Sequence, residues 1–207
     1  MSDVPRARAT APAPAAEGPP LFDTLLREHL EVFVALHRQQ MLVGRMAWQM
    51  SAALRAGHKL LFFGNGGSAA DCQHLAAEFA GRFRRERRPL AALALTTDSS
   101  VLTCVANDFG YDEVFARQVA ALGRAGDCAV GISTSGKSRS VLRALAVARA
   151  AGLHTLGLTG RDGGYMPSFC DQCLVVDHED TARIQEAHLF VGHALCAQIE
   201  QQLGLAD

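Results

Sequence analysis

The sequence predicts an α/β fold, a three-layer α/β/α sandwich with a five-stranded parallel sheet and an N-terminal helical arm. Two observations lead to this prediction. After residue 58 the chain contains five short apolar runs, and most of them are followed by a stretch with helical periodicity. Each run is continuously apolar rather than alternating, which indicates strands covered on both faces, as in a parallel sheet between two layers of helices.

The elements follow in chain order. Residues 21–57 contain no proline and carry apolar residues at intervals of three and four, which predicts one long helix or two. This arm is too long to pack entirely on its own sheet, so we expect it to take part in self-association. The expected strands are 59–64, 90–95, 128–133, 154–160 and 172–177, and the expected helices are roughly 69–82, 98–107, 112–123, 138–151 and 181–203.

The same sequence patterns predict the domain organisation. Residues 21–207, with the arm 21–57 included, are expected to form a single domain. Residues 1–20 are rich in alanine and proline and are expected to be a disordered tail, since this composition buries too little apolar surface to offset the entropy of ordering.

Composition narrows the class of protein. The formal net charge is −1, so no global field favours nucleic acid or an anionic membrane. The dense basic stretch at 81–89 is interpreted as a solvated helix end and loop. No apolar run approaches the length of a membrane span, and the N-terminus lacks the continuous apolar segment of a secretory signal. We therefore expect a cytoplasmic protein with no nucleic-acid and no membrane partner.

The six cysteines fall mostly inside apolar segments, where cysteine behaves as a small hydrophobe, and this fits a reduced protein. Only Cys170 and Cys173, in "CDQC", have a motif spacing, that of half a zinc site or a redox pair. No second pair stands at ligand spacing, and this one leads into a strand rather than opening a helix. We interpret the pair as structural.

Two loops follow expected strands, at the edge where open parallel sheets bind ligands. In "GNGGSAAD", Gly66 and Gly67 permit a close approach of a ligand to the backbone, and Ser68 is expected to cap the following helix. The loop matches neither the dinucleotide fingerprint nor the nucleoside triphosphate motif. Such a loop is a candidate anion site at a helix start.

The second loop, "ISTSGKS", is rich in hydroxyl groups. It gathers Ser133, Thr134, Ser135 and Ser138 around one helix start, which suits a phosphate monoester bound by many neutral donors. The alternative is an ordinary serine-rich cap. Because two such loops follow strands of one sheet, phosphate binding is the better interpretation.

His74 and Glu78 lie four residues apart on an expected helix, so their side chains share a face. That spacing suits two ligands of one metal ion, or a base and its neighbour, and it also suits a surface ion pair. On the last helix, Gln185 and His188 fall near one face, and His193 is about 80° from Gln185. Histidines in an apolar stripe are more often core residues, so this segment alone defines no site.

Taken together, five segments resemble one family. They are "GNGGSAADCQHLAAEFAGRF", "CVANDFGYDEVFARQV", "GISTSGKS", "LTGRDGG" and "ARIQEAHLFVGH". The chain resembles the sedoheptulose 7-phosphate isomerase family, also called phosphoheptose isomerases, which is built on the flavodoxin-like sugar-isomerase (SIS) fold. The resemblance extends from the arm to the C-terminus and leaves out only the first twenty residues.

The resemblance implies a function and an assembly. The family converts sedoheptulose 7-phosphate to D-glycero-D-manno-heptose 7-phosphate through an enediol, the first step toward the ADP- or GDP-heptose that supplies lipopolysaccharide. Its members are homotetramers with active sites between subunits, which would account for the long arm.

The resemblance also implies roles for individual residues. Carried over by motif, the substrate-binding residues are Asn65, Gly66, Gly67, Asn107, Asp108, Ser133, Thr134, Ser135, Ser138 and Gln185. One zinc ion per subunit would be held by His74, Glu78, Gln185 and His193, and the acid–base residues would be Glu78 and His193. Lys137 stands where the family often has asparagine, and we expect it to point to solvent.

Two other classes resemble parts of the chain. A non-catalytic SIS-domain protein that binds the replication initiator DnaA shares the "RIQE" segment, but that family lacks the acidic residue at the position of Glu78 and the histidine at that of His193. Sugar-phosphate-sensing regulators usually carry a DNA-binding domain, which a twenty-residue tail cannot form. The isomerase is therefore the favoured function.

Overall fold

The computed structural model describes residues 20–205 of the chain. The tail expected at 1–20 therefore lies outside the described residues, apart from Pro20. Within them, no helix is long and apolar enough to cross a membrane.

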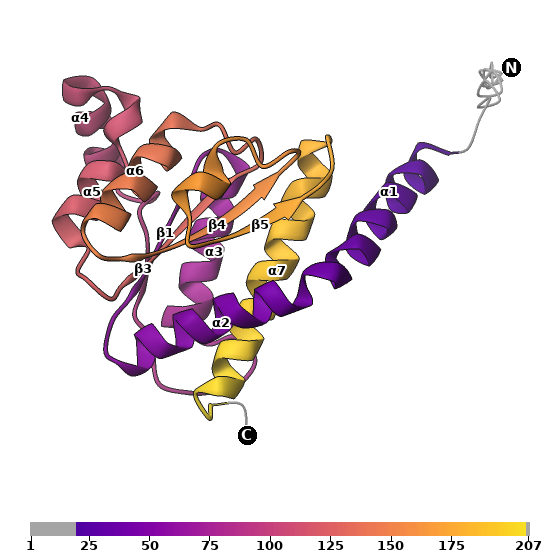
Figure 1. Cartoon of the computed structure of the whole chain (residues 1–207), viewed down its shortest axis with the longest axis horizontal. Coiled ribbons are helices and arrows are strands. Elements are labelled where there is room, and N and C mark those ends of the chain that lie inside the picture. Colours follow the sequence, from indigo (N-terminus) through magenta and orange to yellow (C-terminus); the bar gives the residue numbers. More distant parts are fainter. Residues whose placement is uncertain (1–19, 206–207) are drawn as a thin grey trace, which may run out of the picture.

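A five-stranded parallel sheet forms the centre of the molecule (Figure 1). Its strands are β1 (Leu60–Gly64), β2 (Ala92–Ala94), β3 (Cys128–Ser133), β4 (His154–Gly160) and β5 (Gln172–Val176), in the order β2-β1-β3-β4-β5. Phe62 of β1 is in register with Ala94 on one side and Val130 on the other. The order is that of the flavodoxin-like doubly wound sheet, so the predicted fold class is confirmed.

Helices cover both faces of the sheet. They are α1 (Leu21–Leu36), α2 (Gln40–Arg55), α3 (Gly67–Ala80), α4 (Ser99–Phe109), α5 (Ala116–Leu122), α6 (Arg139–Ala150) and α7 (Thr181–Gln202), with short 3-10 turns η1 (His37–Gln39), η2 (Tyr111–Glu113) and η3 (Met166–Phe169). In Figure 1, α2, α3 and α7 lie on one face, and α4, α5 and α6 on the other. The arm is therefore two helices joined by a tight turn.

Successive strand residues supply two separate cores, which explains why the strands read as continuous apolar runs. Leu60 and Phe62 belong to the core under α2, α3 and α7, whereas Leu61 and Phe63 belong to the core under α5 and α6. All four are essentially fully buried. Alternating side chains along one strand thus fill both layers.

The first half of the arm extends away from the body of the molecule (Figure 1). Near the start of α7, Arg183 Nη1 donates to Leu25 O over 2.9 Å and His29 pairs with Glu186 over 2.8 Å, and further along α7 Phe190 packs against Phe33. The His29 ring is half-buried in its contact with Glu186. On the same helix, the apolar side chains of Phe22 and Val34 are exposed.

The connections place two loops at one point of the sheet. β1 and β3 are neighbours, but α3 follows β1 on one face and α6 follows β3 on the other. The loops 65–66 and 134–138 therefore leave adjacent strand ends in opposite directions. This is the topological switch point, where open α/β sheets bind their ligands.

Candidate active site

The loop after β1 is shaped by its glycines. Gly66 has φ +56° and ψ −123° and stands at the N-cap of α3, a backbone conformation that L side chains rarely adopt. Ser68 was expected to cap this helix. The helix begins two residues earlier than that role needs, so Ser68 lies inside its first turn, is buried, and its side chain makes no capping hydrogen bond.

Gly67 is required by a neighbour rather than by its backbone angles. A Cβ at this position would collide with the carboxamide of Gln185, which reaches it from α7. The sequence-predicted residues Gly67 and Gln185 are thus brought into direct contact from two segments 118 positions apart. This contact sets the position of the Gln185 carboxamide at the start of α3.

The loop after β3 presents hydroxyl groups at the start of α6. Ser133 is buried at the strand end, Thr134, Ser135 and Ser138 are half-buried, and Lys137 is exposed as expected. Ser138 is the N-cap residue of α6, yet its hydroxyl makes no capping bond. The helix start and the hydroxyl groups of this loop together form a set of donors suited to an anion.

Asn65 links the two loops. Its Nδ2 donates to Ser138 Oγ over 2.7 Å and to Ser140 Oγ over 3.0 Å, and its Oδ1 accepts from Tyr111 Oη over 2.8 Å. Residues that follow β1, β3 and α4 are therefore joined through one carboxamide. Asn107 and Asp108 lie on the last turn of α4, where both are exposed and hydrogen-bond to each other over 2.8 Å.

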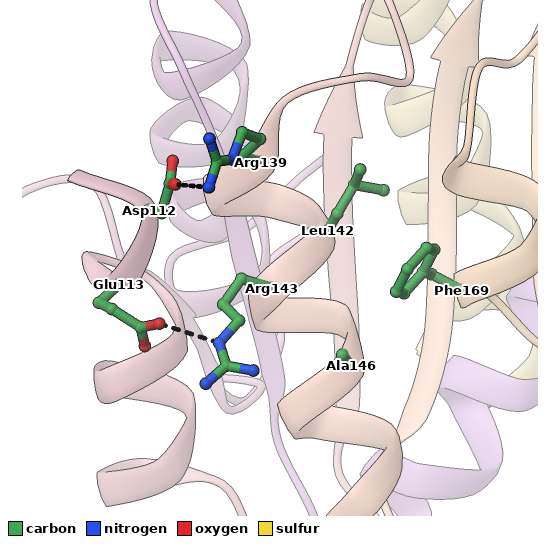
Figure 2. A pocket seen from close by; sticks show the side chains of 7 residues that line it. All are labelled: Asp112, Glu113, Arg139, Leu142, Arg143, Ala146 and Phe169. Carbon is green, nitrogen blue, oxygen red and sulfur yellow. Dashed lines mark hydrogen bonds and ion pairs between the residues drawn. The ribbon is translucent and has the colours of Figure 1, made fainter. Parts of the chain in front are cut away.

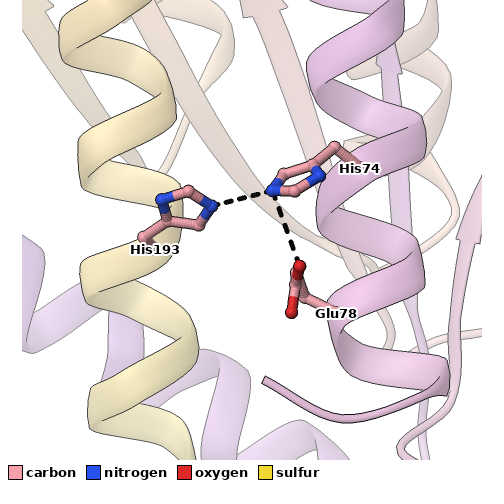
Figure 3. Close-up of side chains that lie close together, drawn as sticks. All are labelled: His74, Glu78 and His193. Atoms are coloured by element: carbon pink, nitrogen blue, oxygen red, sulfur yellow. Dashed lines mark hydrogen bonds and ion pairs between the residues drawn. The ribbon is translucent and has the colours of Figure 1, made fainter. Parts of the chain in front are cut away.

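Three ionisable side chains converge further along α3 (Figure 3). His74 Nε2 lies 2.8 Å from His193 Nε2 of α7 and 3.6 Å from Glu78 Oε1. One candidate ligand atom from each residue lies within 4.8 Å of the others. The His74 side chain is 46% exposed and Glu78 is 21% exposed, so the cluster is open to solvent on one side.

This donor set fits a divalent metal ion. Two imidazole nitrogens and one carboxylate oxygen are the ligands that catalytic zinc sites use, with a further position left for water or substrate. His74 supplies its Nε2 to both contacts, so a neutral tautomer points a lone pair or one N–H into the cluster. The Gln185 carboxamide contacts Gly67, which lies seven residues before His74 on α3, a rise of about 10 Å. Gln185 is therefore farther from the cluster than the other three side chains are from one another.

His188 lies between Gln185 and His193 on α7 but belongs to the core. Burial lowers the pKa of its imidazole to about 4, so the ring is neutral near pH 7. Its Nε2 donates to Thr159 O over 3.0 Å. His188 is therefore a core histidine, as expected for a histidine in an apolar stripe, whereas His193 of the same helix belongs to the cluster.

The connection after α3 covers one side of the cluster. Phe83 stacks on the His193 ring with centroids 5.5 Å apart. The basic stretch was expected to be solvated, and Arg88 is, but the side chain of Arg87 is only 2% exposed and pairs with Glu200 over 2.8 Å. Arg87 also donates to backbone carbonyls at the end of α3, including Glu78 O over 2.7 Å. It fixes the loop that carries Phe83.

A separate shallow pocket lies between η2, α6 and η3 (Figure 2). Two ion pairs border it, Asp112 with Arg139 over 2.8 Å and Glu113 with Arg143 over 2.9 Å. None of the residues expected to bind substrate or metal lines it. Its ion pairs fasten η2, and with it Tyr111, to α6.

Sequence reasoning missed three residues of the site. Ser140 stands two positions beyond the serine-rich loop and is buried against Asn65, a position that helical spacing alone could have indicated. Tyr111 and Phe83 gave no such signal, because each is an aromatic residue in a connection whose path depends on tertiary contacts.

Comparison with known proteins shows the family to which the chain belongs. The family model described as the SIS domain matches residues 26–160. The phosphoheptose isomerase of Paramagnetospirillum magneticum is 62% identical over 148 residues, which are 72% of this chain and 77% of that protein.

Two solved structures are similar along almost their whole length. The phosphoheptose isomerase of Neisseria gonorrhoeae has 43% identity and a TM-score of 0.83, covering 87% of this chain and 97% of that one. That of Francisella tularensis has 33% identity and a TM-score of 0.84, covering 87% and 96%. With its sheet order, its two loops and these relatives, the chain belongs to the SIS-domain family and, within it, to the phosphoheptose isomerases.

Proposed function

We propose that the protein isomerises sedoheptulose 7-phosphate to D-glycero-D-manno-heptose 7-phosphate. The observation that carries the proposal is the His74–Glu78–His193 cluster, which joins α3, the helix that begins at the glycine loop, to α7. An aldose–ketose isomerase needs this combination, a phosphate anchor and a proton carrier held apart from it. The cluster also favours the isomerase over the initiator-binding alternative.

Binding begins at the serine-rich loop. Ser133, Thr134, Ser135 and Ser138 would hold the phosphate at the start of α6, where the helix adds its own N–H groups. The sugar chain would then run past Asn65 and the Gly66–Gly67 backbone toward α3, with Asn107, Asp108 and Gln185 contacting its hydroxyl groups. Remote binding energy of this kind positions the reacting carbons.

The chemistry moves one proton between carbons and one between oxygens. Glu78 would remove the proton from C1 of the ketose and return it to C2, through an enediol. His193 would relay the other proton from the C1 hydroxyl to the C2 oxygen, so that the carbonyl ends on C1. The stacked Phe83 ring keeps the His193 imidazole in place and limits water on that side.

The cluster would bind zinc, with His74, Glu78 and His193 as ligands. Bound there, a zinc ion supplies Lewis-acid polarisation of the substrate oxygens. The resemblance adds Gln185 as a further ligand, a role that requires its side chain to turn from Gly67 toward His74.

We propose that the active unit is a homotetramer with active sites between subunits. The exposed apolar side chains of α1 support self-association, since a monomer seldom leaves such a stripe in water. The product would feed ADP- or GDP-heptose synthesis for lipopolysaccharide in the cytoplasm. A sugar phosphate carries too much charge to leave through an apolar bilayer, which fits this placement.

The test is the Glu78→Gln variant, assayed with sedoheptulose 7-phosphate by following the aldose product, with and without a chelator. Removing the base should lower kcat by about 10²- to 10⁴-fold. Glu86→Gln is the matched control, because Glu86 is exposed in the connection after α3, and it should keep full activity. Near-wild-type turnover by Glu78→Gln would overturn the assignment, and an inactive wild-type protein would overturn the proposed function.

A further inference from the structure

Tyr111 is held at the mouth of the anion site. Its hydroxyl donates to Asn65 Oδ1 over 2.8 Å, while the residue as a whole is 56% exposed. The turn η2 that carries it is fastened to α6 by the two ion pairs of Asp112 and Glu113 with arginines (Figure 2). The turn that places the Tyr111 hydroxyl next to Asn65 is thus held to α6 by two ion pairs.

The Asn65 carboxamide makes three hydrogen bonds. Its Nδ2 donates to Ser138 and Ser140, and its Oδ1 accepts from Tyr111. A carboxamide has two N–H groups, so both of them are used, on two serines of the same loop and helix.

This arrangement decides what the serine hydroxyl groups can do. A serine oxygen that accepts an N–H bond keeps its own proton for another acceptor, such as a phosphate oxygen. If the carboxamide turned over, its oxygen would face Ser138 and Ser140 and would take their protons. In the orientation that the structure shows, the Tyr111 hydroxyl is the third partner of the carboxamide and restrains its position against both serines.

We propose that Tyr111 is a positioning residue for the substrate phosphate: by holding Asn65 through its hydroxyl, it fixes the carboxamide that positions Ser138 at the anion site. The proposal rests on the proposed function and adds to it a residue that does not touch the reacting carbons. It places the effect of Tyr111 on binding and not on proton transfer.

The test is Tyr111→Phe, which removes only the hydroxyl. The KM for sedoheptulose 7-phosphate should rise about three- to tenfold, the range expected for one neutral hydrogen bond, with kcat within about twofold of wild type. The concentration of inorganic phosphate that gives half of its stabilising thermal shift should rise in parallel. Tyr165→Phe is the matched control, since Tyr165 is the other tyrosine of the chain and is exposed, and it should change neither value.

A double-mutant cycle separates action through Asn65 from a direct contact. In an Asn65→Ala background, Tyr111→Phe should have no further effect on KM or on the phosphate response. An equal effect in both backgrounds, a fall in kcat with unchanged KM, or no effect in the wild-type background would each overturn the proposal. If wild type fails to isomerise the sugar phosphate, the proposed function fails, while the inorganic phosphate measurement still decides the role of Tyr111.

Discussion

At the scale of single residues, the site depends on contacts between side chains from distant segments. Gly67 is an example, since its missing Cβ makes room for the Gln185 carboxamide. A Gly67→Ala variant should displace the end of that flexible side chain and leave the fold intact. We expect kcat/KM to fall by about tenfold or more, because small displacements of a positioning group have large effects on rate.

Gly44→Ala is the control for this substitution. Gly44 lies inside α2, and a Cβ there would meet its nearest neighbour only at 4.0 Å. Alanine in a helix interior stabilises by up to about 1 kcal/mol relative to glycine, so the melting temperature should hold or rise and the activity should stay the same. Full activity of Gly67→Ala would show that Gln185 works equally well when moved.

The same scale shows how much of the site the sequence could predict. Spacing alone placed His74 and Glu78 on one face, and composition alone marked the serine-rich loop. Neither could show that His193 comes within 2.8 Å of His74, because their separation of 119 positions is bridged only by the packing of α3 on α7. For that step the resemblance to a known family supplied what local pattern could not.

At the scale of elements, periodicity predicted every strand but left open whether the arm is one helix or two. Residues 37–39 contain neither glycine nor proline, so nothing local ends the first helix. At the turn η1, Gln39 Nε2 donates to Val175 O of the edge strand β5, a tertiary contact that the local sequence pattern does not reveal. β2 is shorter than the apolar run 90–95, because only Ala92–Ala94 are in register with residues of β1.

The connection between α3 and β2 is stabilised by one buried ion pair. The side chains of Arg87 and Glu200 are 2% and 3% exposed, and Arg87 also donates to carbonyls at the end of α3. Arg87→Ala leaves a buried carboxylate without its partner, so we expect unfolding in urea to require about 3–5 kcal/mol less free energy.

Arg88→Ala provides the comparison for that measurement. Arg88 is the next residue and is exposed, so its removal should change the free energy of unfolding by no more than about 0.5 kcal/mol. Equal effects of the two substitutions would mean that the basic stretch contributes through net charge and not through the Arg87–Glu200 pair.

At the scale of the whole molecule, the sheet and the arm have separate tasks. The sheet brings the loops after β1 and β3 to one switch point, so two short segments far apart in the sequence lie together there. The arm contributes little to that site within one chain. The helix α1 contacts α7 at Arg183 and Glu186, on either side of Gln185, and at Phe190, whereas α2 packs in the core, so α1 is joined to the site through α7.

Self-association of the arm is therefore expected to control activity. Leu30 and Val34 lie one helical turn apart on α1 and are 54% and 76% exposed. Replacing both with glutamate should convert a four-chain assembly, measured by light scattering during gel filtration, into smaller species with strongly reduced isomerase activity. The substituted side chains are already in water, so the melting transition of the individual chain should persist. Glu31→Gln, on the same helix, should change neither mass nor activity, and a wild-type chain that is monomeric and fully active would contradict the proposed tetramer.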